Sequence, residues 1–140
     1  MIPLKDGSYA YGRLRNFPLV SFYDFNSKAP VQDVDKIGAR PILFSVLVHK
    51  SALKKWKVIA KRPLEENLRR GITRFLQDIG DPSKCTIADE DGNERAATPS
   101  ECVGLERSAV WEDSHVEDRL LDAINGRPNK WYENLKVKLP

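Results

Sequence analysis

The first part of the chain shows the alternation of hydrophobic and polar residues that is typical of β-strands. Residues 9–14 alternate after an Asp-Gly turn signal, and residues 19–25 are rich in β-forming side chains. Residues 42–49 are apolar on both faces, which predicts a central strand covered on both sides. Residues 51–55 fit a short helical turn or loop, and alternation at 56–61 predicts one more strand.

The second half of the chain mixes the spacing of helices with that of strands. Apolar residues recur at helical spacing over 64–75, although Gly71 weakens this helix. Residues 85–88 and 95–97 flank an Asp-Gly pair, which predicts a β-hairpin. Residues 105–111 are a candidate for a further strand.

Two capping boxes predict where helices begin. Residues 98–101 read Thr-Pro-Ser-Glu and predict a short helix with proline at its first position. Residues 114–117 read Ser-His-Val-Glu and predict a longer helix that Gly126 closes. Residues 131–135 form a terminal helical or extended segment. The pattern predicts an α+β fold, with a strongly bent antiparallel sheet or partly open barrel and a few short helices packed at one side.

Length and composition fit one folded domain. At about 150 residues per domain, the 140 residues correspond to a single domain over 1–140. The hydrophobic share of 41% and the charged share of 31% are typical of globular proteins. No apolar run reaches the roughly 18 residues of a membrane span, and residues 1–7 do not resemble a secretory signal. Two cysteines without a Cys-x-x-Cys pair fit a reducing compartment, so we expect a cytoplasmic protein.

Charge is unevenly distributed along the chain. Residues 1–70 contain 14 Lys and Arg against 6 Asp and Glu, whereas residues 71–140 contain 9 against 14. Such an asymmetry can mark a partner surface, complementary contact between the two halves, or only solvated faces. The basic residues are spread over several segments, so charge alone does not indicate nucleic-acid binding.

Few residues could carry catalysis or bind a metal. His49 and His115 are the two histidines, and nothing in the sequence places Cys85 or Cys102 beside either of them. A nucleophile needs a base held next to it, so we expect structural or surface roles for both histidines. The spacings match no zinc, calcium or phosphate-binding pattern. We therefore expect no enzyme activity, no metal site and no cofactor.

Aromatic and basic residues interleave in the first half of the chain. The aromatic members are Tyr9, Tyr11, Phe22, Tyr23 and Trp56. A β-barrel that binds single-stranded nucleic acid stacks bases on aromatic side chains above a basic groove. Alternating aromatic residues also fill the core of a small barrel, and this is the interpretation that we favour. A small β-barrel that binds nucleic acid remains the alternative function.

An ordered set of short motifs extends from Ile2 to about Leu139. It comprises Ile-Pro-Leu-Lys-Asp-Gly-Ser-Tyr-Ala-Tyr-Gly-Arg at 2–13, Phe-Tyr-Asp at 22–24, Val-His-Lys-Ser-Ala-Leu at 48–53, Trp-Lys-Val-Ile-Ala-Lys at 56–61, Thr-Pro-Ser-Glu-Cys at 98–102, Gly-Leu-Glu at 104–106 and Val-Glu-Asp-Arg-Leu at 116–120. This set resembles the immunity protein 26 family of bacterial polymorphic-toxin and contact-dependent growth inhibition systems.

The resemblance implies a protein that acts by binding. Its expected partner is the C-terminal domain of a cognate toxin, in a one-to-one complex, and neither a membrane nor nucleic acid is an expected partner. The resemblance implies no catalytic residues and no cofactor. It further implies core positions for Tyr11 and Trp56, and polar anchoring positions for Asp24, Glu106 and Arg119.

The same resemblance suggests where the toxin binds. Many toxins of such systems are nucleases with basic clefts, so an acidic element could occlude the active site by mimicking the substrate. The candidate contact residues are Asp89, Glu90, Asp91, Glu94, Glu112 and Asp113. An acidic hairpin tip can equally be a solvated turn. With a toxin of another class, the basic half could form the contact surface.

Overall fold

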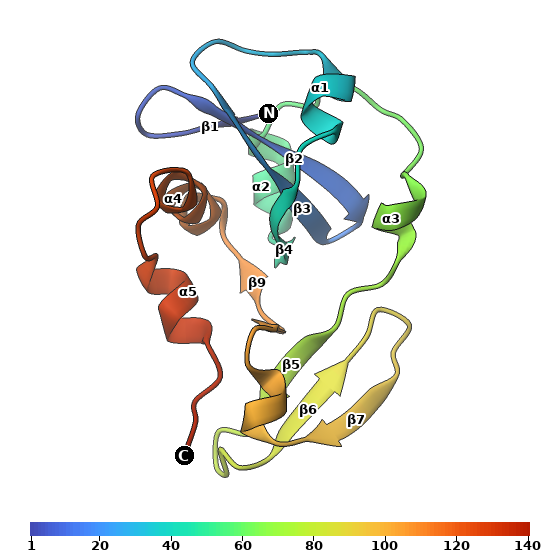
Figure 1. Ribbon diagram of the computed structural model, residues 1–140, viewed down its shortest axis with the longest axis vertical. Coiled ribbons are helices and arrows are strands. Elements are labelled where there is room, and N and C mark those ends of the chain that lie inside the picture. Colours follow the sequence, from blue (N-terminus) through green and yellow to red (C-terminus); the bar gives the residue numbers. More distant parts are fainter. The chain divides into compact units, whose positions relative to one another are not determined.

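Two β-sheets organise the chain in the computed structural model, which describes residues 1–140 (Figure 1). Each sheet lies in its own unit. Unit 1 comprises Met1–Leu64 and Val110–Trp131, and unit 2 comprises Glu65–Ala109 and Tyr132–Pro140. Mainly antiparallel sheets combined with short, separate helices confirm the predicted α+β class.

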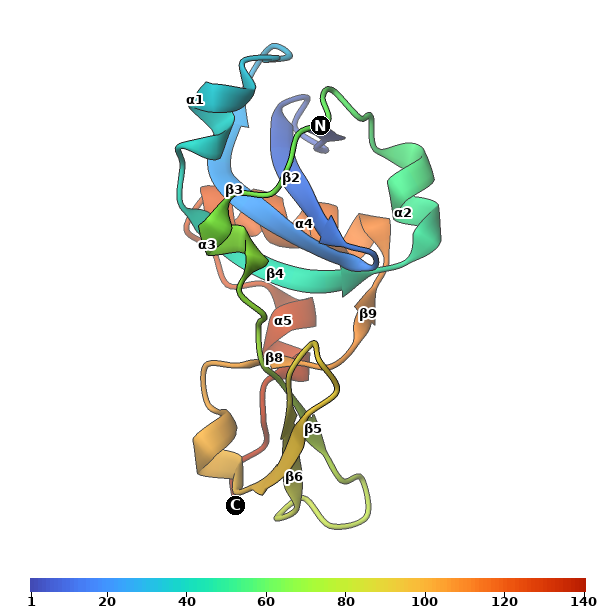
Figure 2. The ribbon, with the colours of Figure 1, turned by 90° about the vertical axis from the view of Figure 1, so that its right-hand side faces the viewer.

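The sheet of unit 1 has five strands in the order β1-β2-β3-β4-β9. They are β1 (Ile2–Pro3), β2 (Tyr9–Asn16), β3 (Leu19–Ser27), β4 (Ile42–Val48) and β9 (Val110–Trp111). Neighbours are antiparallel except β4 and β9, which run parallel. The register shifts twice between β2 and β3 and once between β3 and β4. Such irregularities bend and twist strands, and the sheet curls into a half-barrel (Figure 2).

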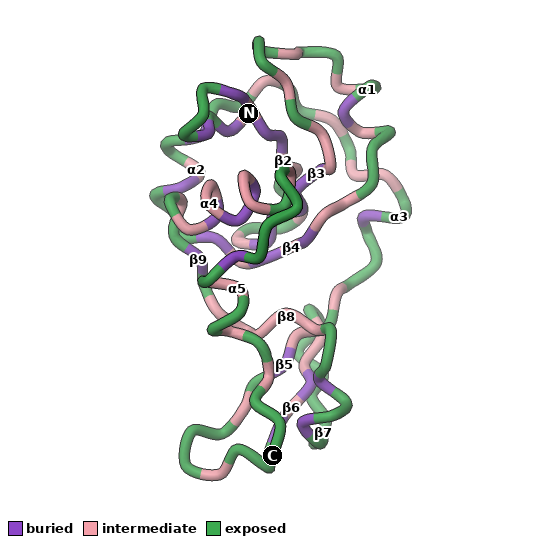
Figure 3. The backbone as a smooth tube through the Cα atoms, turned by 60° about the vertical axis from the view of Figure 1, so that its left-hand side comes forward, coloured by how far each residue is buried: buried purple, intermediate pink, exposed green.

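Side chains cover both faces of this sheet. The neighbouring residues Phe22 and Tyr23 point to opposite faces of β3, and both are buried. Phe22 packs against Phe44 and, edge to face, against Trp56, with ring centroids 5.1 and 5.8 Å apart. On the other face, Tyr23 clusters with Tyr11. The core positions expected for Tyr11 and Trp56 are therefore confirmed, and buried residues follow β3 and β4 through the unit (Figure 3).

The helices of unit 1 flank the curled sheet. They are α1 (Val34–Gly38), α2 (Lys50–Lys55), α4 (Asp113–Ile124) and the first residues of α5 (Lys130–Leu135). Helix α4 buries Val116 and Leu120 fully. Beside them the buried Arg119 guanidinium lies 3.8 Å from the ring centroid of Phe44, a cation–π contact. No helix of the chain combines the length and apolar character needed to cross a membrane.

The predicted capping box at 114–117 is wrong. Helix α4 begins at Asp113, and its N-cap residue Glu112 makes no side-chain capping bond. Glu117, expected to cap the helix, instead accepts hydrogen bonds from Lys55 Nζ at 2.9 Å and from Trp56 Nε1 at 3.1 Å. A cation and an indole N–H from a distant part of the chain thus replace the local bond.

The sheet of unit 2 has four strands in the order β7-β6-β5-β8. The elements of this unit are α3 (Glu66–Arg69), β5 (Arg74–Gln77), β6 (Cys85–Ala88), β7 (Glu94–Ala97), the 3₁₀ helix η1 (Pro99–Cys102) and β8 (Glu106–Arg107). Strands β5 and β8 run parallel, and the other pairs are antiparallel. A small core gathers Phe75, Cys85, Ile87 and Cys102. The predicted β6–β7 hairpin and the capping box at Thr98 are confirmed.

Residues 56–61 do not form the predicted strand. Helix α2 ends at Lys55, and the chain then runs without helix or strand to Glu65. The backbone of Lys57 exchanges two hydrogen bonds with Met1, but no ladder extends beyond this pair. The alternating side chains therefore lack the neighbouring strand that such a pattern needs.

Two other predicted elements are shorter than expected. The helix over 64–75 is reduced to α3, and β5 begins at Arg74, in keeping with the poor helix propensity of Gly71. The strand over 105–111 is divided into β8 and β9, which belong to different sheets.

Candidate functional site

The carboxylates predicted to contact a toxin lie in both units. Unit 2 contains those of the β6–β7 hairpin, namely Asp89, Glu90, Asp91 and Glu94. Unit 1 contains Glu112 and Asp113, at the start of α4.

Asp89 shapes the turn of the hairpin. Its carboxylate accepts hydrogen bonds from the Asn93 side-chain amide at 3.1 Å and from the backbone N–H groups of Asn93 and Asp91 at 3.0 and 2.9 Å. These bonds, led by that from the Asn93 side chain, lower the pKa of Asp89 below its ordinary value. Gly92 completes the turn at a φ of +86°, which glycine adopts at little cost.

The other three hairpin carboxylates face solvent. Glu90, Asp91 and Glu94 are exposed, and their side chains form no ion pair or hydrogen bond. Their negative charges are therefore uncompensated within the chain. The hairpin presents three free carboxylates on a turn that a fourth carboxylate holds in shape.

Glu112 and Asp113 differ from each other. Glu112 is exposed and makes no side-chain cap bond. Asp113 forms an ion pair with Lys55, with 2.9 Å between Oδ2 and Nζ. Hydrogen bonding from Lys55 lowers the pKa of Asp113. Only Glu112 therefore resembles the free carboxylates of the hairpin.

Lys55 links helix α2 to helix α4. Its ammonium group contacts both Asp113 and Glu117, and the neighbouring Trp56 donates its indole N–H to the same Glu117. No local spacing in the sequence signals this network, because its partners lie about sixty positions apart. The network connects α2 to α4, and its charged groups are paired with one another.

The histidines and cysteines do not assemble a reactive centre. His49 is the N-cap of α2 and accepts from Ser51 N, and the ring of His115 stacks on Trp131 with centroids 3.7 Å apart. Cys85 and Cys102 are buried in the core of unit 2. Burial raises the pKa of the Cys102 thiol, which keeps it protonated and poorly nucleophilic. No group of three or more potential ligands is arranged to hold a metal ion.

Four of the five aromatic residues that interleave with basic residues in the first half offer no stacking surface, and the fifth, Tyr9, is half-buried. Tyr11, Phe22, Tyr23 and Trp56 are all buried. Bases stack only on ring faces that solvent can reach, so these four buried side chains cannot bind bases. They therefore do not support a nucleic-acid-binding barrel. The interpretation as core is confirmed for these four residues, whereas Tyr9 is only partly buried against the cluster of Tyr11 and Tyr23.

Comparison with known protein families identifies a match over the first part of the chain. Residues 1–86 match the protein family described as Immunity protein 26, which is more than half of the 140-residue chain. The chain belongs to the immunity protein 26 family. No curated protein and no solved structure matches it. Membership in the immunity protein 26 family implies an immunity protein with a toxin partner, and it suggests that the chain acts by binding rather than by catalysis.

The immunity protein 26 match ends within β6. It includes the four motifs that begin the ordered set, at 2–13, 22–24, 48–53 and 56–61. The motifs from residue 98 onward lie outside the matched stretch, so their resemblance to the family stays a prediction. All six candidate carboxylates also lie beyond residue 86, and their role rests on geometry and charge alone.

Proposed function

We propose that this immunity protein binds the C-terminal domain of a cognate toxin in a one-to-one complex and neutralises it by occluding its active site. The toxin is a nuclease, and the complex forms in the cytoplasm of a cell that carries a polymorphic-toxin or contact-dependent inhibition system. Family membership supports the toxin partner. The charge and shape of the β6–β7 hairpin support the proposal that the toxin is a nuclease.

The observation that carries this proposal is the turn held by Asp89. Three hydrogen bonds fix the turn, and the carboxylates of Glu90, Asp91 and Glu94 stay exposed around it. A nuclease cleft is basic because its substrate is a polyanion, so fixed negative charges speed association and favour binding there. A turn that is ordered before binding loses little further conformational freedom in the complex.

The proposal is tested by reversing charge at the hairpin. The variant Glu90→Lys/Asp91→Lys leaves Asp89 and Gly92 in place, so the turn keeps its shape. The matched control Glu66→Lys/Glu133→Lys makes the same charge change at two exposed positions of unit 2. The measurements are the association rate with the toxin domain encoded by the adjacent gene, and protection of cells that express that toxin.

We expect the hairpin variant to associate about tenfold more slowly at low salt and to protect cells less well, while the control behaves as the unchanged protein. The difference should shrink as salt rises, because exposed charges are screened. An equal rate for variant and control would reject the hairpin as the contact surface. Absence of protection by the unchanged protein would reject the proposed function itself.

A further inference from the structure

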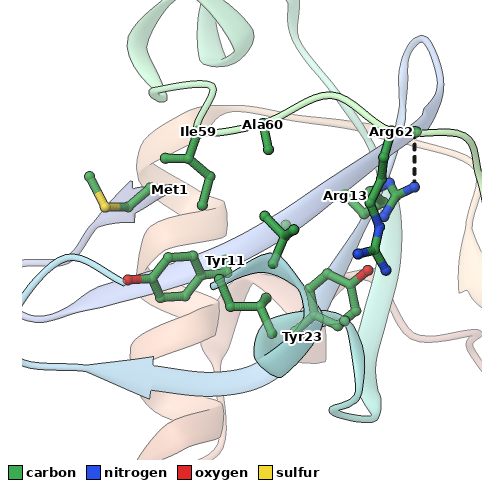
Figure 4. Close-up of a pocket in the computed structure, with 11 residues that line it drawn as sticks. Met1, Tyr11, Arg13, Tyr23, Ile59, Ala60 and Arg62 are labelled. Atoms are coloured by element: carbon green, nitrogen blue, oxygen red, sulfur yellow. Dashed lines mark hydrogen bonds between the residues drawn. The ribbon is translucent and has the colours of Figure 1, made fainter. Parts of the chain in front are cut away.

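A groove opens in unit 1 between strand β2 and residues 57–62. Its main hollow has a volume of about 380 Å³, and a second hollow of about 70 Å³ continues it toward α1. Figure 4 shows the smaller hollow, with Ile59 and Ala60 on one wall and Tyr11 of β2 on the other. Both walls belong to the same unit.

The wall formed by β2 has an open strand edge. Strand β1 pairs with β2 only at Tyr9 and Ala10, so no strand lies beside residues 11–16 on that side. Pairing with β3 on the opposite side is regular over residues 12–14. Every second residue of an antiparallel strand directs its N–H and C=O away from the paired neighbour. This stretch of β2 is therefore able to receive another strand.

Ile59 packs the opposite wall against the cluster of Tyr11 and Tyr23, whereas hydrogen bonds hold this wall only near its two ends. Met1 and Lys57 exchange backbone hydrogen bonds of 2.8 and 3.2 Å at one end. At the other end the Arg13 guanidinium donates to the carbonyl oxygens of Arg62 and Pro63, at 3.2 and 2.7 Å. Residues 58–61 between these ends make no hydrogen bond within the chain.

The groove is basic and partly apolar. Its lining contains Arg13, Lys57, Lys61 and Arg62 but no Asp or Glu. Arg62 forms an ion pair with Asp35, whereas Lys57 and Lys61 form none. Unit 1 as a whole contains 15 Lys and Arg against 9 Asp and Glu, so the excess of positive charge extends beyond the groove.

Two aliphatic side chains stand at the groove in contact with water. Leu14 is 48% exposed and Val58 is 66% exposed, and they lie on opposite walls. The aromatic lining residues Tyr11, Tyr23 and Trp56 are buried and leave no face on which a base could stack. Cations beside aliphatic groups and an open strand edge fit a protein segment better than a nucleic acid.

We propose that this groove binds an extended acidic segment of the toxin domain, which adds as a strand to the open edge of β2. Its backbone pairs with residues 12–14, its carboxylates meet Lys57 and Lys61, and an aliphatic side chain lies between Leu14 and Val58. The inference rests on the proposed function and adds a second contact, distinct from the acidic hairpin of unit 2. The same toxin thus offers a basic cleft to the hairpin and an acidic segment to the groove.

Charge reversal inside and outside the groove tests the ionic part of this contact. The variant Lys57→Glu/Lys61→Glu changes two lysines that line the groove and form no ion pair. The control Lys28→Glu/Lys50→Glu changes two exposed lysines of unit 1 outside it. We expect the groove variant to bind the toxin domain with about a tenfold higher Kd at low salt, and the control to bind as the unchanged protein does.

A second variant tests the groove without altering charge. Ala60 is exposed and lines both hollows, so Ala60→Trp fills the groove from a segment that has no regular structure to disrupt. The matched control is Ala29→Trp, in another exposed loop of unit 1. We expect Ala60→Trp to weaken toxin binding about tenfold, with a Tm close to that of the unchanged protein and of the control.

Amide hydrogen exchange measures directly whether a toxin segment pairs with β2. Toxin binding should slow amide exchange within residues 11–16 about tenfold or more, because the N–H groups that point away from β3 gain partners. If toxin binding leaves amide exchange at residues 11–16 and 57–62 unchanged and the groove variants bind normally, the inference is overturned. The proposed function then still stands. If the unchanged protein does not bind the toxin domain, both are rejected. Binding of a single-stranded DNA oligonucleotide that is lost in the Lys57→Glu/Lys61→Glu variant would reassign the groove to nucleic acid and overturn the inference.

Discussion

Trp56 shows how one side chain can join a core to a polar network. Its ring is buried against Phe22, and its indole N–H, which would otherwise be an unpaired donor, is bonded to Glu117. Burial of a large aromatic residue contributes more to stability than almost any other single side chain. A substitution at position 56 should therefore destabilise the fold strongly.

We expect Trp56→Ala to lower the free energy of unfolding by about 3–5 kcal/mol, through lost burial and the cavity that remains. Urea denaturation followed by far-UV circular dichroism measures this loss, and Lys57→Ala at the exposed neighbouring position is the control. A loss below about 1 kcal/mol would show that Trp56 is not part of the core.

Free carboxylates can be separated from structural ones only when the fold is known. Asp89 and Glu90 are neighbours of the same type, yet Asp89 builds the turn and Glu90 is exposed and unpaired. Asp113, with Glu112, is a second candidate in the sequence, but its charge is balanced by Lys55. The sequence thus predicted a cluster of acidic side chains. It could not predict which of these carboxylates have a structural role and which are exposed and unpaired.

At the scale of elements, ion pairs attach α4 to other parts of unit 1. Lys55 of α2 binds Asp113, and Lys5 of the β1–β2 turn binds Asp118 at 2.8 Å. Hydrogen bonds from Lys55 and from Lys5 lower the pKa values of Asp113 and Asp118 below their ordinary value of 3.8. The native protein therefore holds these protons less tightly than the unfolded chain does.

This difference in pKa determines how the stability of the fold changes at low pH. A carboxylate with a lowered native pKa stabilises the fold above its unfolded value, and that contribution is lost as the pH falls through the native value. We expect the Tm to be nearly constant between about pH 5 and pH 7 and to decrease below about pH 4. The variant Lys55→Met should have a lower Tm at pH 7, because Asp113 no longer has its cation. For the same reason its Tm should decrease less at low pH. An identical acid decrease in the variant would show that the pair contributes nothing.

Elements with local signals were predicted well from the sequence. The Asp-Gly turns, the Thr98 capping box and the central strand β4 depend on residues that are close in sequence, and all are found. Residues 56–61 had a strand pattern but no neighbour to pair with. The groove could not be predicted from local patterns, because its walls come from β2 and from a segment more than forty positions away.

At the scale of the whole molecule, the two units differ in charge and in architecture. Unit 1 contains the curled five-stranded sheet and the basic groove, whereas unit 2 contains the acidic hairpin and the smaller core. Each unit is built from two separate stretches of the chain. Neither unit can be excised as one continuous segment. That the 140 residues fold as a single domain stays a prediction.

Membership in the immunity protein 26 family suggests that this chain acts by binding a toxin. The most direct test is to titrate the full chain into the toxin domain encoded by the adjacent gene, at about 150 mM salt, while the activity of the toxin is followed. We expect a saturable one-to-one complex with a Kd near the nanomolar range, and loss of toxin activity in parallel with saturation. Absence of binding, or a complex in which the toxin remains fully active, would contradict the proposed function.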